Sequence, residues 1–144
     1  MRAIVTDLHA RLSAALTVPV LLPEQREEPL QAAPLDAQGR PRVGGGERGL
    51  GAYLQQHPGG YVQLYDLQPV MTTSGIYDEH WATVDAIAAT DEVADPLARQ
   101  VRALLGGTPR TGGRIRLAVP PRTERDGASV RVTLQFSVRS AHPR

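Results

Sequence analysis

Side chains that could move a proton or bind a metal gather at one place in the sequence, the triplet Asp78-Glu79-His80. An imidazole beside two carboxylates is suited to both tasks. Adjacent residues of an extended segment point to opposite sides, however, so the three side chains do not readily converge. None of the histidines pairs with another at a metal-ligand spacing such as His-x-x-x-His. We therefore interpret the triplet as loop surface and predict no metal site.

A second arrangement that could do chemistry is the pair Asp66 and Asp85, which fall on segments predicted as strands. Two carboxylates held across a cleft are what glycoside hydrolysis requires. The favoured interpretation places both acids on a polar sheet face, opposite arginines of neighbouring strands. The alternative is a small enzyme or ligand-binding domain with its site at Asp66, Asp78, His80 and Asp85. Alanine substitutions at that site would then abolish an activity and leave assembly intact.

Two residue types that many enzymes need are missing from the sequence. There is no Cys, which excludes disulfides, thiolate catalysis and Cys-ligated metals. All 16 basic residues are Arg, so the lysines of P-loops, Schiff bases and pyridoxal-phosphate enzymes are excluded as well. We predict no catalytic residue and no cofactor, and we expect the protein not to be an enzyme. The net charge of +1 also argues against binding to duplex nucleic acid.

Two segments have the periodicity of amphipathic helices. Residues 2–16 carry an apolar stripe at three- and four-residue steps. The second stripe is formed by Leu97, Val101, Leu104 and Leu105, and glycines end that helix. A start at Thr90 or Asp91 would place Pro96 deep enough to clash with the preceding turn. We therefore predict Asp95 as N-cap, with Pro96 at the first helical position.

The strongest strand signal lies at 129–139, where apolar and polar residues alternate without a break. Shorter strands are predicted at 18–22, 61–67, 81–89 and 114–119, the first at a sheet edge because Pro19 lacks an amide proton. Segments 68–78 and 120–127 are predicted as loops. This order predicts a single α+β domain over residues 1–144, in two layers. We expect a mixed, mainly antiparallel sheet of four to five strands, with two helices on one face and a polar opposite face.

The pattern dissolves over residues 23–60, which hold five prolines and a triple glycine. A loop this long within a small domain is usually functional or disordered. We expect a brief turn of structure at 49–54 and a mobile chain elsewhere. Arginine and aromatic side chains, which are enriched at interface hot spots, lie in this loop and beside the next one. The candidate interface residues are Arg40, Arg42, Arg48, Tyr53, Leu54, Tyr77 and Trp81.

The order of elements resembles that of the tail-terminator (minor tail, tail-completion) protein family of long-tailed bacteriophages. The resemblance covers most of the chain. It is carried by the opening helix at 4–16, the Val18-Pro19-Val20 strand, Gly60-Tyr61-Val62-Gln63-Leu64, the strand at 81–89 leading into the helix at 97–105, and the final strand at 129–139. The long loop at 23–60 departs from the family pattern and leaves the position of the subunit in a phage neck open.

The resemblance implies a structural virion protein without catalytic residues. It implies a homo-oligomer, commonly a hexameric ring, that caps the tail tube and joins it to the head–tail connector or head-closure protein. DNA would meet such a protein only while passing through the ring lumen, and no membrane would be involved. The alternative within the same class is another neck protein, either a head-closure or an adaptor subunit. The long loop would serve as a docking arm.

Overall fold

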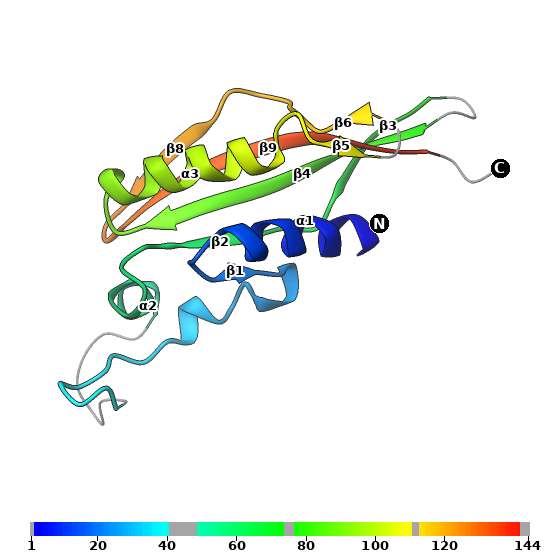
Figure 1. Cartoon of the computed structure of the whole chain (residues 1–144). Coiled ribbons are helices and arrows are strands. Elements are labelled where there is room, and N and C mark those ends of the chain that lie inside the picture. The colour runs from blue at the N-terminus through cyan, green and yellow to red at the C-terminus, as the bar shows by residue number, and fades with distance from the viewer. Residues whose placement is uncertain (1, 41–48, 74–76, 111–112, 142–144) are drawn as a thin grey trace.

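The computed structural model describes residues 2–40, 49–73, 77–110 and 113–141. It confirms an α+β fold, in which helices α1 (Arg2–Ala15) and α3 (Asp91–Leu105) lie on one face of a seven-stranded sheet (Figure 1). Five strands run in the order β1 (Val20–Leu21), β2 (Tyr61–Leu64), β4 (Tyr77–Ala88), β9 (Ser129–Ala141) and β7 (Arg116–Leu117). Strand β3 (Gln68–Thr73) pairs with β4, and β8 (Arg122–Asp126) pairs with β9. No helix in the described ranges is long and apolar enough to cross a membrane.

The two longest strands, β4 and β9, form the centre of the sheet. They pair antiparallel along their whole common length, from Tyr77 opposite Ala141 to Ala88 opposite Val130. The alternation predicted for the last strand is confirmed, since its five apolar side chains are all buried: Val130, Val132, Leu134, Phe136 and Val138. Strand β1 lies at a sheet edge, as Pro19 predicted, and pairs parallel with β2.

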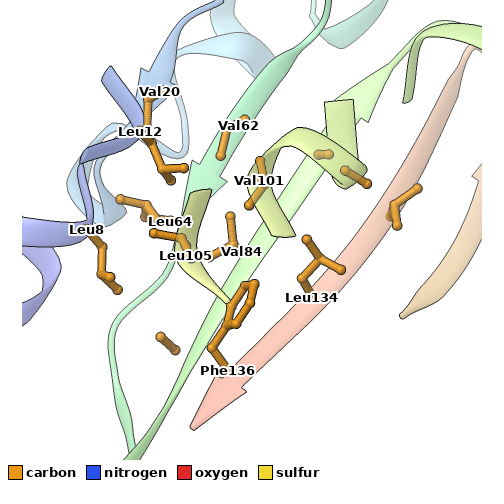
Figure 2. Close-up of a cluster of buried hydrophobic side chains, with 14 of the residues drawn as sticks. Leu8, Leu12, Val20, Val62, Leu64, Val84, Val101, Leu105, Leu134 and Phe136 are labelled. Carbon is orange, nitrogen blue, oxygen red and sulfur yellow. The ribbon is translucent and has the colours of Figure 1, made fainter. Parts of the chain in front are cut away.

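The main core lies between this sheet and the two helices (Figure 2). Leu8 and Leu12 of α1 and Val101 and Leu105 of α3 are at most 1% exposed. They meet apolar side chains of the central strands, among them Phe136, which is fully buried. Burial of a large apolar side chain is worth about 1.5–3 kcal/mol, so this contact between helices and sheet holds the fold together.

The predicted start of the second helix is wrong. Helix α3 begins at Asp91 with Thr90 as N-cap, and Pro96 lies inside it. The proline removes one hydrogen bond to the preceding turn. Interactions in the first turn of α3 act against that loss. Asp91 and Glu92 lie at the positive end of the helix dipole, and Ala94 is fully buried. Tertiary packing therefore extends the helix beyond the position that local propensity favours.

Two segments predicted as loops are strands, which raises the strand number above the expected four to five. Residues 68–73 form β3, and residues 122–126 form β8, whose side chains are all exposed. An edge strand without a buried face carries no apolar alternation, so the sequence pattern could not reveal it. The strand predicted at 114–119 is also interrupted. Fully buried Ile115 separates β7 from β6 (Gly113–Arg114), which pairs with β5 (Pro109–Arg110) in a second sheet.

The described parts of the long loop contain more secondary structure than predicted. They contain the 3-10 helices η1 (Pro23–Gln25) and η2 (Pro29–Gln31), each with proline near its start, and helix α2 (Leu50–Gln56). The expected turn at 49–54 is thus confirmed and extended. Helix α2 packs on the sheet face opposite α1 and α3, in a small second core formed by Leu21, Tyr53, Leu54, Tyr61 and Ile87. That face is therefore polar only over part of its area.

Candidate assembly surface

Residues 23–40, which follow β1, form an arm that projects from the β1 edge of the sheet (Figure 1). At its base, Arg2 Nη1 donates to Glu24 Oε2 at 3.0 Å, and this bond lowers the pKa of Glu24. Further out, Gly49 N donates to Ala32 O at 2.8 Å, which ties the arm to the residue that precedes α2. The arm is thus fastened to the body of the protein at its base.

The far part of the arm contains a turn organised by Asp36. Its Oδ1 accepts hydrogen bonds from the backbone amides of Gln38 and Arg40, both at 2.9 Å. Asp36 N also donates to Arg40 O at 2.8 Å. A carboxylate that binds nearby amides is a common way to fix a turn without help from the rest of the protein. Residues 36–40 therefore form a defined turn, where the sequence indicated only irregular chain.

The predicted interface residues fall into different environments. Arg40 is exposed beside the Asp36 turn, and Trp81 is half-buried on β4. Tyr53 and Leu54 are buried in the second core, so they stabilise the arm's attachment and are not available to a partner. Tyr77 starts β4, but its side chain lies outside the described part of the structure, and Arg42 and Arg48 lie outside the described residues altogether.

The polar sheet face beside α2 is organised around Asp85, which is 3% exposed. Tyr65 OH donates to Asp85 Oδ2 at 2.7 Å, and Thr133 Oγ1 donates to Oδ1 at 2.6 Å. Arg131 Nη1 lies 3.5 Å from Oδ2. Burial raises the pKa of Tyr65 well above its ordinary value, and the hydrogen bond to Asp85 adds to that shift. Every oxygen of the carboxylate thus has a partner from the chain itself, which favours a structural role for Asp85.

The residues of the alternative catalytic site do not come together. His80 and Asp85 lie on the same strand five positions apart, so their side chains leave opposite faces of the sheet. His80 is on the helix-covered face, 7% exposed, and its Nδ1 has no hydrogen-bond partner among the described residues. Asp66 is exposed after the end of β2. Within the described ranges, no group of three or more His, Asp or Glu side chains could hold a metal ion.

A positively charged groove was not predicted from the sequence. It has a volume of about 600 Å³ and lies between the end of α3 and the strands β6 and β7. Four arginines line it, Arg99, Arg102, Arg114 and Arg116, and we call this feature the arginine groove. The arginines come in two pairs, three and two residues apart on a helix and on an extended segment. Each pair by itself has the pattern of ordinary solvent-facing charge, and only the tertiary fold brings the two together.

Comparison with known protein families and with curated proteins finds no match to this sequence. Comparison with solved structures does find the fold elsewhere. A chain of the "Virion of native gene transfer agent (GTA) particle" aligns with a TM-score of 0.53 and 17% sequence identity. The alignment covers 94% of this chain and 92% of that chain. At this level of identity the likeness is one of fold, and it extends over nearly the whole length of both chains.

Proposed function

We propose that this protein is a structural protein of a phage-like virion. More narrowly, we propose a ring-forming tail terminator, which caps the tail tube and joins it to the head connector. The observation that carries the proposal is the fold shared, over 94% of the chain, with a chain from a gene transfer agent virion. The order of elements from which the tail-terminator resemblance was inferred is also largely present in the structure.

The surface of the protein supports assembly better than catalysis. The two residues best suited to proton transfer, His80 and Asp85, leave opposite faces of the sheet and cannot act on one substrate. The arm, by contrast, reaches outward from the edge of the sheet (Figure 1). A projecting element with its own internal hydrogen bonds loses little entropy when it docks. We therefore propose a non-enzymatic protein whose arm contacts other subunits in the virion.

The proposed partners are copies of the same chain, in a hexameric ring, together with the tail tube protein and the connector or head-closure protein. A closed ring requires two different complementary surfaces on each subunit. Arg40 and Trp81 remain candidate contacts because both are accessible in the isolated chain. A head-closure or adaptor subunit is the second candidate function, because such proteins would use the same kinds of surface at another level of the neck.

Negative-stain imaging of the purified protein, alone and mixed with tail tubes, tests the proposal. We expect closed rings that bind to one end of each tube. Rings that bind the connector and ignore the tubes would instead favour the head-closure or adaptor function. A protein that stays monomeric at all concentrations and binds neither structure would contradict an assembly role.

A shortened arm tests whether this element docks. Deleting residues 36–48 joins Leu35 to Gly49 and keeps the hydrogen bond between Gly49 and Ala32 within reach. We expect the thermal unfolding midpoint to change little, because the second core at α2 is left intact. The shortened protein should no longer bind tubes. The control is Asp36→Ala, which removes only the side chain that organises the turn and should leave more assembly than the deletion does.

A further inference from the structure

The arginine groove has the composition of a docking site for an acidic and partly apolar segment. Its charged rim is formed by Arg99, Arg102, Arg114 and Arg116, and Ala103 and Leu117 add apolar surface between them. Among the residues that the structure describes, no carboxylate lines it. Four positive charges therefore lie together in a chain whose net charge is only +1. Guanidinium groups above apolar surface are well suited to bind carboxylates whose neighbours are hydrophobic.

No carboxylate among the described residues neutralises the arginines of the groove. In the part that the structure describes, Arg99, Arg102 and Arg116 form no ion pair, and Arg114 donates to the backbone oxygen of Gly107 at 2.7 Å. The helix dipole accounts for a basic residue such as Arg102 in the last turn of α3. It does not account for Arg114 and Arg116, which come from other elements. Binding of an external, negatively charged partner explains why all four arginines lie together.

The arm carries a surface of matching chemistry, which we call the arm surface and define as Glu27, Glu28, Leu30 and Leu35. Glu28 is exposed, and Glu27 is held only loosely, by a 3.8 Å contact with its neighbour Arg26. Leu30 and Leu35 are 56% and 41% exposed, large values for leucine side chains. The arm thus combines acidic with apolar groups, as the groove combines arginine with apolar groups.

The two surfaces lie on opposite edges of the sheet. The arm follows the edge strand β1, whereas β7, which borders the groove, is at the other end of the strand order. Figure 1 shows the arm leaving at the lower left and β6 at the upper right, beyond α3. An arm in this position does not reach the groove of its own chain. Two complementary surfaces on opposite sides of one subunit produce head-to-tail contacts between copies.

We propose that the arm surface of one copy docks in the arginine groove of the next copy. The inference rests on the proposed ring assembly and names the contact that closes it. Glu27 and Glu28 pair with the arginines of the neighbour, where carboxylate and guanidinium can form two parallel hydrogen bonds. Leu30 and Leu35 cover the apolar surface at Ala103 and Leu117. Each subunit then gives one arm and receives one, as a heterologous ring requires.

Charge reversal on each side of the contact tests the proposal. The groove variant is R99E/R102E and the arm variant is E27R/E28R, and their masses in solution are measured by light scattering after size-exclusion chromatography. We expect each variant to associate at least about a hundredfold more weakly than the wild type, because the reversal places like charges opposite each other at two groove positions or at both arm positions. A chain that carries all four substitutions should form rings again. An equimolar mixture of the two variants should also form rings, in which the variants alternate, because both kinds of junction between unlike variants then have opposite charges.

The matched control compares R116E with R122E. Both replace an exposed arginine on a short strand beside β9, but only Arg116 lines the groove. R116E should weaken the ring and R122E should not. Circular dichroism and thermal unfolding should be close to wild type in every variant, since the replaced side chains are exposed.

The outcomes separate this inference from the proposed function. A wild-type ring that survives both reversals overturns the arm-to-groove contact and leaves ring assembly standing. A wild-type protein that is monomeric under all conditions overturns both. Fluorescent duplex DNA is the probe for the other anionic partner. Binding of DNA that R99E/R102E abolishes, with rings unaffected, would assign the groove to phosphate and overturn the contact.

Discussion

Strands β4 and β9 present two faces to very different surroundings. On one face, Leu134 and Val84 lie under α1 and α3 in an apolar core. On the other, one residue along the same strands, Asp85 and Thr133 belong to a hydrogen-bonded polar network. The first face is defined by shape and volume, whereas the second is defined by pairing of donors with acceptors. The comparison indicates that the helix-covered face supplies most of the stability, while the polar face adds specificity and accessible surface.

Phe136→Ala tests the helix-covered face and should have the largest effect. The side chain is fully buried and packs in the main core between the sheet and the two helices. Truncation of a buried phenylalanine costs about 3–5 kcal/mol of unfolding free energy, because the cavity cannot close fully. Urea denaturation measures the change. The matched control is Gln135→Ala, one residue earlier on the polar face, which should cost much less. Equal losses at both positions would contradict the division of roles between the faces.

How far the sequence predicts this structure also depends on the face concerned. The helix-covered face was predictable because Val132, Leu134 and Phe136 recur at every second residue. Edge strand β8 was missed because all its side chains are exposed, so no alternation exists to be found. The start of α3 was missed because Pro96 lies inside the helix, where local propensity disfavours it. The local sequence pattern reflects which residues are buried. Where a strand buries no side chain, or where burial depends on residues distant in sequence, the pattern predicts little about the structure.

The candidate site was less predictable than the fold, for a related reason. Tyr53 and Leu54 are the residue types of an interface, yet α2 turns them towards Tyr61 and Ile87. The arginine groove combines residues from the end of α3 with residues of β6 and β7, and no spacing rule links those two segments. The role of Arg40 and Trp81 as interface residues remains a prediction, since both are accessible but accessibility does not identify a partner. An assembly surface is formed by residues that are distant in sequence. Composition therefore indicates the chemistry of such a surface but does not identify the residues that form it.

Asp85→Ala tests the polar face and should have the second-largest effect. It leaves the hydroxyl groups of Tyr65 and Thr133 without their acceptor in a partly buried place. Loss of hydrogen bonds to a buried charged group costs about 2–3 kcal/mol. Thr133→Val, which removes only one of the two donors, should cost about 1 kcal/mol. If Asp85→Ala is as stable as the wild type in urea, the network contributes no stability and the polar face is neutral to folding.

Alkaline pH distinguishes the part of the polar sheet face that α2 covers from the part that is open to solvent. Burial beneath α2 raises the pKa of Tyr61 from 10.0 to about 12. The folded protein then keeps the phenol proton that the unfolded chain loses, so the stabilisation is complete below pH 10 and is lost as pH rises to about 12. The loss attributable to Tyr61 is at most about 2–3 kcal/mol, because a tenfold difference in proton affinity corresponds to about 1.4 kcal/mol.

Tyr61→Phe isolates this contribution and should have the smallest effect of the three tests. The variant has no phenol proton to lose, so its unfolding free energy, measured in urea between pH 9 and 12, should fall less steeply than that of the wild type. Tyr65, whose pKa is raised as well, still titrates in this variant, so some slope remains. Identical slopes for the wild type and Tyr61→Phe would mean that α2 leaves Tyr61 open to water, and the second core would then not exist in solution.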